Sequence, residues 1–155
     1  MLKYLNTQVV FQEFPGETTF AINLTNCPNH CPGCHSPKLW EDIGTELTPV
    51  ELVRLVEPVL SGITCIGFMG GDGNIPELLK LARFCKANYP NIKIGWYSGR
   101  TNWNSTIMEP FDYCKFGPYM ADRGGLDNPN TNQVLLERID NEEWKDITKK
   151  FQKSC

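Results

Sequence analysis

Three cysteines lie close together in the chain, at Cys27, Cys31 and Cys34. The stretch that holds them is rich in Pro and Gly, so it cannot continue a helix or a strand, and the three sulfurs can turn toward one point. Thiolates are soft ligands that hold iron–sulfur clusters or zinc, and both usually take four protein ligands. A cubane cluster bound by three cysteines would leave one iron open to a small molecule. The spacing therefore favours an open iron–sulfur cluster.

Two other interpretations of this stretch remain open. A structural zinc site would need a fourth ligand, which His30 or His35 lies near enough in sequence to supply. Further thiols are scattered along the chain, at Cys65, Cys85, Cys114 and Cys155. A disulfide framework is the weaker alternative, because seven cysteines is an odd number and no signal peptide is recognised.

Gly70, Gly71 and Asp72 directly follow a continuous apolar run over residues 63–69. Glycine permits positive φ and the close approach of other groups, and a carboxylate beside exposed backbone groups can receive a cationic amine. The same three residue types are common at ordinary turns. Alone, this segment therefore indicates only a turn.

Ser98 and Arg100 follow the next apolar run, residues 92–97. Both side chains carry hydrogen-bond donors suited to a carboxylate or a ribose. The alternative is that Ser98 simply turns the chain and that Arg100 is solvated. The residues by themselves do not decide between these two interpretations.

The elements that must position these residues alternate between strand and helix. Apolar and β-branched runs predict strands over 18–24, 63–69, 92–97 and 111–116. Helical periodicity predicts helices over 48–62, with Thr48 as N-cap, and over 75–88. This alternation predicts an α/β fold with a mostly parallel sheet, whose ligand sites gather at the carboxyl ends of the strands.

The two ends of the chain are less regular. We expect a first strand over 7–14, a long surface loop over 120–132 and a short last strand over 133–139. The tail, 141–155, begins acidic and ends basic, the charge order that complements a helix dipole, and it is therefore expected to be helical. Asp112 is expected to play a structural part at the start of its strand.

Length and charge exclude several classes of protein. At 155 residues the chain fits a single domain, 1–155, and a full eight-unit β/α barrel needs about 250 residues. A barrel-like architecture must therefore be partial. The net charge of −3 offers no basic field for nucleic acid, and no segment approaches the roughly 20 apolar residues of a membrane span. Many unpaired thiols suit the reducing cytoplasm.

The cysteine spacing resembles that of the radical S-adenosylmethionine superfamily. The wider stretch, residues 23–40, with Asn26 before Cys27 and Trp40 at its end, is similar to the anaerobic ribonucleoside-triphosphate reductase-activating proteins. The resemblance runs over nearly the whole chain and implies a partial, incomplete β/α barrel. It also implies two cofactors, a [4Fe-4S] cluster and S-adenosyl-L-methionine.

The resemblance assigns roles to the residues described above. It implies that Cys27, Cys31 and Cys34 hold the cluster, that the segment Gly70, Gly71 and Asp72 binds the amino group of S-adenosylmethionine, and that Ser98 and Arg100 contact its carboxylate or ribose. Many members carry an aromatic residue before the third cysteine, where this chain has Gly33. His35 is expected to supply the missing wall.

The resemblance also implies an activity. These activating proteins cleave S-adenosylmethionine reductively to a 5′-deoxyadenosyl radical and generate a glycyl radical on the large subunit of the anaerobic reductase, with an electron donor such as flavodoxin or a thiol system. One alternative is a radical enzyme that acts on another glycyl-radical enzyme or on a small substrate. The other is a non-catalytic iron–sulfur or zinc module, which would have no use for Gly70, Gly71 and Asp72.

Overall fold

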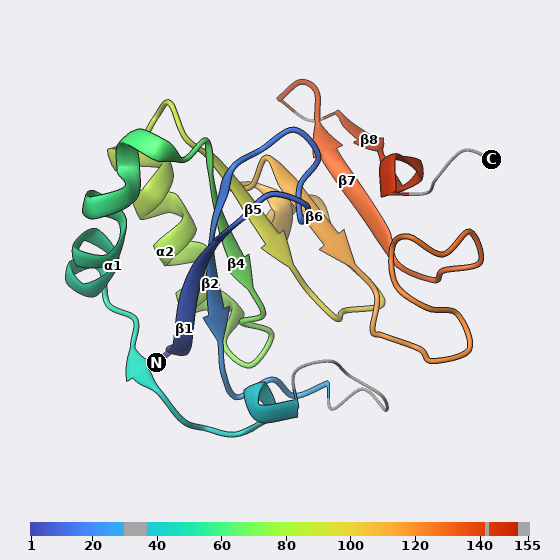
Figure 1. Ribbon diagram of the computed structural model, residues 1–155, viewed down its shortest axis with the longest axis horizontal. Coiled ribbons are helices and arrows are strands. Elements are labelled where there is room, and N and C mark those ends of the chain that lie inside the picture. Colours follow the sequence, from blue (N-terminus) through green and yellow to red (C-terminus); the bar gives the residue numbers. More distant parts are fainter. Residues whose placement is uncertain (30–36, 142, 152–155) are drawn as a thin grey trace.

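One mixed sheet dominates the computed structural model, which describes residues 1–29, 37–141 and 143–151. Within these ranges the sheet has eight strands in the order β3-β1-β2-β4-β5-β6-β7-β8 (Figure 1). The strands are β1 Lys3–Val10, β2 Thr19–Leu24, β3 Thr45–Glu46, β4 Cys65–Met69, β5 Lys93–Tyr97, β6 Tyr113–Phe116, β7 Val134–Arg138 and β8 Trp144–Asp146.

The centre of the sheet is parallel. Strands β2, β4, β5 and β6 pair parallel, whereas β1 and β3 on one side and β7 and β8 on the other pair antiparallel. All four central strands therefore end at the same edge of the sheet. The prediction of an α/β fold with a partial barrel and a mostly parallel core is confirmed.

Two helices cover one face of this sheet, α1 Pro49–Val56 and α2 Ile75–Asn88 (Figure 1). The side chain of Thr48 accepts a hydrogen bond from the amide of Glu51 at 3.1 Å, which confirms the predicted N-cap of α1. The predicted helix 48–62 continues past Val56 as a 3-10 segment. The remaining described helices are short: η1 Pro37–Trp40, η2 Glu57–Gly62, α3 Ser105–Met108 and η3 Thr148–Phe151.

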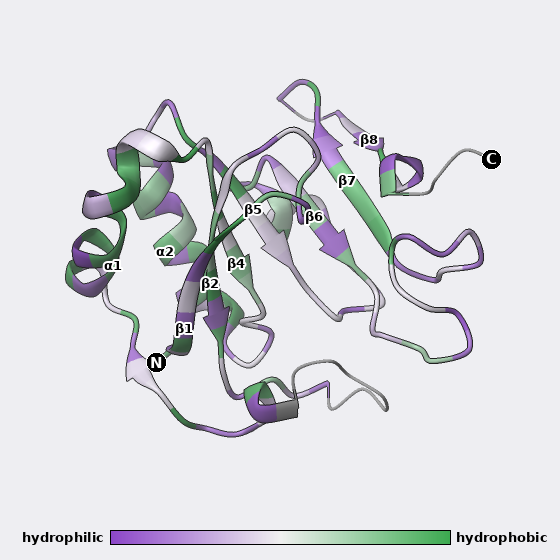
Figure 2. Cartoon of the chain, in the orientation of Figure 1, coloured by the Kyte–Doolittle hydropathy of each residue, from purple (hydrophilic) through white to green (hydrophobic). Residues whose placement is uncertain are grey.

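The main hydrophobic core lies between these helices and the sheet, and Figure 2 shows hydrophobic residues along β4 and on both helices. The helices contribute fully buried leucines, such as Leu52 and Leu78, against Ile66, Phe68 and Trp96 of the sheet. A strand covered on both faces carries a continuous apolar run rather than an alternating one. This explains why these strands were predictable from the sequence.

A smaller core on the opposite face is built around Phe14. Gly67 and Gly95 are partners in the pairing of β4 with β5, and the Phe14 ring lies against both of them. Its ring centroid is 5.2 Å from that of Tyr97 and 5.1 Å from that of Tyr113. Phe14 therefore packs against the middle of β4 and β5 on this face of the sheet.

Two predicted elements are wrong in their bounds or type. The first strand was expected over 7–14, but β1 runs from Lys3 to Val10, and residues 11–16 form bends and a turn because Phe14 is drawn into its own core. The tail was expected to be helical, but Trp144–Asp146 is a strand, and in the described part of the tail only Thr148–Phe151 is helical, as a 3-10 turn. Pairing with β7 satisfies backbone groups that would otherwise form an open sheet edge, and this outweighs the charge pattern.

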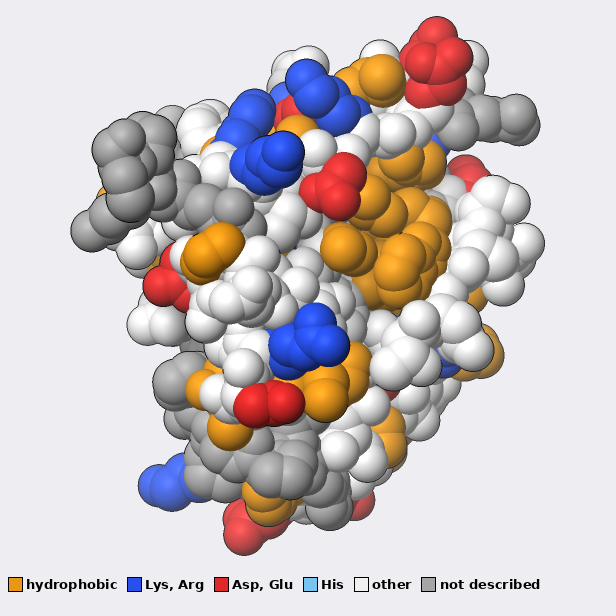
Figure 3. Space-filling model, turned by 90° about the vertical axis from the view of Figure 1, so that its right-hand side faces the viewer, with side chains coloured by type: hydrophobic (Ala, Val, Ile, Leu, Met, Phe, Trp, Pro, Cys, Tyr) orange, Lys and Arg blue, Asp and Glu red, His pale blue; other side chains and the backbone are white. Residues whose placement is uncertain are grey.

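The side of the molecule formed by β7 and β8 carries a gathering of hydrophobic side chains (Figure 3). A hollow of about 650 Å³ between α3 and β8 is lined in part by Trp103, Met108 and Trp144. The helix α3 has four residues, fewer than the eight of α1 and the 14 of α2. In the described part of the chain, none of the helices has the length and apolar character required to cross a membrane.

The contact between Phe14 and Gly95 predicts a large effect of a single methyl group. A Cβ atom at Gly95 would overlap the Phe14 ring, so Gly95→Ala should lower the free energy of unfolding by about 1–3 kcal/mol. Urea unfolding measures this change. Gly62→Ala is the matched control, because no heavy atom lies within 4 Å of a Cβ built there. Equal midpoints for the two variants would show that Phe14 is not seated on Gly95.

Candidate metal and cofactor site

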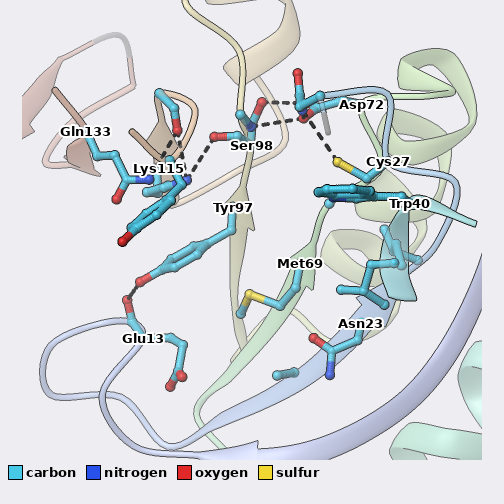
Figure 4. Close-up of a pocket in the computed structure, with 18 of the residues that line it drawn as sticks. Glu13, Asn23, Cys27, Trp40, Met69, Asp72, Tyr97, Ser98, Lys115 and Gln133 are labelled. Atoms are coloured by element: carbon cyan, nitrogen blue, oxygen red, sulfur yellow. Dashed lines mark hydrogen bonds between the residues drawn. The ribbon is translucent and has the colours of Figure 1, made fainter. Parts of the chain in front are cut away.

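A cavity of about 460 Å³ opens on the face of the sheet opposite α1 and α2, and it reaches the carboxyl ends of the parallel strands. Figure 4 shows Cys27, Asp72 and Ser98 together at one end, with Trp40 beside Cys27. Strands and loops from β1 to the start of β7 line the cavity, through Gln8, Val10, Glu13, Ala21, Asn23, Leu24, Cys27, Asn29, Leu39, Trp40, Met69, Gly70, Asp72, Tyr97, Ser98, Gly99, Lys115, Gly117, Tyr119 and Gln133.

Cys27 is held at this cavity by the backbone around it. Its amide donates to the carbonyl of Leu39 at 2.8 Å, and the amide of Asn26 donates to Glu41 at 2.9 Å. The hydroxyl of Thr25 donates to the carbonyl of Ile43 at 2.6 Å. The chain after β2 is thus tied to η1 and to the segment that follows it, and the half-buried Cys27 is placed on the cavity wall.

The other predicted residues of the cysteine loop, Cys31, Cys34 and His35, lie outside the described residues. Within the described part of the chain, no group of three His, Cys, Asp or Glu side chains converges. The predicted ligand set is therefore represented here by Cys27 alone.

The Gly70-Gly71 pair performs the turn that the sequence indicated. Gly70 has φ 109° and Gly71 has φ 95°, a region that side-chain-bearing residues rarely adopt. The amide of Gly70 donates to Tyr97 at 2.9 Å, and its carbonyl accepts from the indole of Trp96 at 2.8 Å. These bonds fix the turn to β5 and direct Asp72 into the cavity.

The carboxylate of Asp72 is the centre of the hydrogen-bond network. The hydroxyl of Ser98 donates to Oδ1 at 2.6 Å, while the amide of Gly99 donates to Oδ2 at 2.9 Å and the side-chain amide of Asn29 donates to Oδ2 at 2.7 Å. A carboxylate offers about four lone-pair positions. Asp72 is therefore locked in one orientation with capacity for about one more donor.

Ser98 and Arg100 are placed differently by the structure. Ser98 is buried beneath Asp72, and its hydroxyl also accepts a hydrogen bond from the amide of Arg100 at 3.1 Å. The guanidinium of Arg100 donates to the carbonyl of Asn102 at 3.2 Å, and Arg100 is not among the residues that line the cavity. The predicted contact between Arg100 and a cofactor stays a prediction. Asp112 plays the expected structural part, because its carboxylate accepts from the amide of Ile94 at 2.9 Å.

Sequence reasoning missed several residues of the cavity. Lys115 donates to the carbonyls of Ser98 and Gly117 at 3.2 and 3.1 Å, and its ammonium lies 5.5 Å from the centre of the Tyr97 ring. The hydroxyl of Tyr97 donates to the carbonyl of Glu13, and burial raises the pKa of this phenol. The signal that could have identified Lys115 is a charged residue within an otherwise buried strand.

The donor set suits an iron–sulfur cluster next to an amino-acid-like cofactor. A soft thiol and a carboxylate with one open lone pair share one cavity, and Leu24, Leu39 and Met69 add apolar wall. These described residues therefore fit the predicted cofactors.

A model of the 4Fe-4S single cluster domain matches residues 15–114, which make up more than half of the chain. The chain belongs to the 4Fe-4S single cluster domain family. The matched range contains all three cysteines of the loop as well as Gly70, Gly71 and Asp72. This domain is typical of radical S-adenosylmethionine activating enzymes, so the prediction of a [4Fe-4S] cluster with S-adenosylmethionine is confirmed at the level of the family. Neither the curated proteins nor the solved structures gave a match.

The other described cysteines lie away from the cavity. Cys65, Cys85 and Cys114 are fully buried, as expected of small hydrophobic residues. Burial raises the pKa of the Cys85 thiol to about 12 and also raises the pKa values of Cys65 and Cys114.

This difference in burial predicts which thiols react. Thiolate is the reactive form, so at pH about 8 roughly one part in ten thousand of Cys85 is reactive. Iodoacetamide should therefore modify Cys27 in the folded, metal-free protein and spare Cys65, Cys85 and Cys114, as judged by peptide mass spectrometry. Concentrated urea, which exposes every thiol, is the control. Rapid modification of Cys85 without urea would contradict the buried placement.

Proposed function

We propose that this protein is the activating enzyme of an anaerobic ribonucleoside-triphosphate reductase, which cleaves S-adenosylmethionine reductively and generates a glycyl radical on the reductase's large subunit. The observation that carries the proposal is that Cys27 and Asp72 line one cavity at the carboxyl ends of parallel strands. A carrier protein or a structural zinc module needs a metal ligand but no carboxylate facing it.

The residues of the chain would divide the work as follows. Cys27, Cys31 and Cys34 would hold the cluster, and Asp72 would accept the ammonium group of S-adenosylmethionine with its remaining lone pair. Ser98 keeps the Asp72 carboxylate turned toward the cavity through its 2.6 Å hydrogen bond. A reduced cluster held there would supply the one electron needed to cleave the sulfonium of S-adenosylmethionine reductively.

The walls of the cavity serve to protect that chemistry. Leu24, Leu39, Trp40 and Met69 present apolar surface, which excludes water and leaves few hydrogen donors near a reactive carbon. The phenolic hydrogen of Tyr97, a potential donor, is committed to the carbonyl of Glu13. The role of the chain itself is therefore to bind and orient S-adenosylmethionine and to shield the reacting carbon from water and from hydrogen donors.

A protein substrate suits an incomplete barrel, since a loop of another chain can enter from an open side. The loop over 120–132 is proposed as the docking surface because it is mostly exposed, rich in Gly and Asn, and leads into the cavity residue Gln133. The electron donor is proposed to be a flavodoxin or a thiol system, and the proposed compartment is the cytoplasm. The acidic balance of the chain gives no reason to propose nucleic acid as a partner.

The deciding experiment is anaerobic. The protein is reconstituted with iron and sulfide, reduced, and mixed with S-adenosylmethionine and a candidate anaerobic reductase, and both 5′-deoxyadenosine and the glycyl radical signal are measured. Both products together support the proposal. Deoxyadenosine without a glycyl radical would mean that the partner is wrong, and neither product from an intact cluster would mean that the protein is a non-catalytic module.

The proposed ligand set predicts a sharp contrast among cysteine variants. Cys27→Ala, Cys31→Ala and Cys34→Ala should each abolish formation of 5′-deoxyadenosine, because a missing thiolate leaves the cluster incompletely held. Cys155→Ala should retain full activity. Iron content and product are measured together, and cleavage retained in any of the three loop variants would refute the cluster assignment.

The proposed role of Asp72 predicts a loss of affinity without a loss of metal. Asp72→Ala should raise the Kd for S-adenosylmethionine roughly 10- to 100-fold, since a hydrogen bond to a charged group is removed, while iron content stays near that of the wild type. Equilibrium binding of S-adenosylmethionine to the reconstituted protein measures this Kd. Asp140→Ala, at an exposed position between β7 and β8, is the control. An unchanged Kd in Asp72→Ala would reject the role.

A further inference from the structure

Asn29 lies two residues after Cys27 and lines the same cavity. Its side-chain nitrogen is 3.6 Å from the sulfur of Cys27 and 2.7 Å from Oδ2 of Asp72. A primary amide carries two hydrogens, one for each of these acceptors. One half-buried side chain thus joins the cysteine loop to the turn after β4.

Gly99 provides a second, independent indication that the structure accommodates the Asn29 side chain at this place. A Cβ atom at residue 99 would lie 2.6 Å from the Asn29 nitrogen and 2.9 Å from its Cγ. The absence of a side chain at Gly99 therefore makes room for the amide. The backbone amide of Gly99 also donates to Oδ2 of Asp72 at 2.9 Å, so both donors converge on one oxygen.

The two acceptors carry like charge in the metal-loaded protein. A ligating cysteine is a thiolate, and Asp72 is a carboxylate, so the amide hydrogens between them stabilise both and reduce their repulsion. Hydrogen bonds to cluster sulfurs favour the reduced, more negative state and raise the reduction potential. Groups that orient a metal ligand typically change affinity or activity by about 10- to 100-fold when they are removed.

We infer that Asn29 is a positioning residue that couples the cluster ligand Cys27 to the cofactor-binding carboxylate Asp72. Through one side chain it sets the reduction potential of the cluster and the affinity for S-adenosylmethionine together. This inference rests on the roles of Cys27 and Asp72 in the proposed function. It does not depend on which protein receives the radical.

The test compares Asn29→Ala with the wild type, both reconstituted anaerobically. The cluster's midpoint potential, followed by its electron paramagnetic resonance signal without S-adenosylmethionine, should move to a more negative value. The Kd for S-adenosylmethionine should rise roughly tenfold or more. Iron content and thermal unfolding should match those of Asn91→Ala, a control at an exposed position between α2 and β5.

Gly99→Ala provides the second variant, because it keeps Asn29 but displaces its amide. It should shift the midpoint potential and the Kd in the same directions as Asn29→Ala. If Asn29→Ala fails to assemble a cluster, Gly99→Ala alone tests the role of Asn29. An unchanged potential in whichever of the two variants holds a cluster would overturn the inference.

These measurements are separable from the test of the proposed function. They use no reductase, so a wild-type protein that binds S-adenosylmethionine but forms no glycyl radical would refute the proposed partner and leave the Asn29 coupling standing. A wild-type protein that binds neither cluster nor S-adenosylmethionine would refute both, and this outcome is visible before any variant is made.

Discussion

The negative charge of the Asp72 carboxylate must be compensated by hydrogen-bond donors, and these donors determine much of the arrangement of the site. A charged group in a cavity loses part of its hydration, and only hydrogen-bond donors or an opposite charge offset that loss. Asp72 obtains donors from Asn29, Ser98 and Gly99, which lie in two different connections of the sheet. The same three bonds that satisfy the charge hold the ends of β2, β4 and β5 in one arrangement.

The parallel register of the central strands makes this convergence possible. Because β2, β4, β5 and β6 run in the same direction, their following loops meet at one edge although long stretches of chain separate them. Gly67 and Gly95 have no side chains and so admit the ring of Phe14, which packs against Tyr97, a residue of the cavity wall. Aromatic packing thus supports the cavity wall at Tyr97, and hydrogen bonds to Asp72 hold together the loops at the carboxyl ends of the strands.

Much of the fold was predictable because it follows from local regularities. Continuous apolar runs marked β4 and β5, and Thr48 before Pro49 marked the start of α1. The failures came where distant partners outweigh local preference. The charge order of the tail favours a helix, yet Trp144–Asp146 joins the open edge of β7, and the indole of Trp144 lies 4.6 Å from the guanidinium of Arg138.

The cysteine spacing was enough to indicate a soft-metal site, and Gly70, Gly71 and Asp72 after a buried strand were enough to indicate a turn that carries a carboxylate. Which side chains surround that carboxylate follows from contacts between loops that are far apart in the sequence. Asn29 and Asp72 are 43 positions apart, and their 2.7 Å contact exists because the crossover between β2 and β4 returns the chain to the same edge. Local spacing constrains neighbours along the chain, whereas contacts across a sheet depend on the register that the whole core fixes.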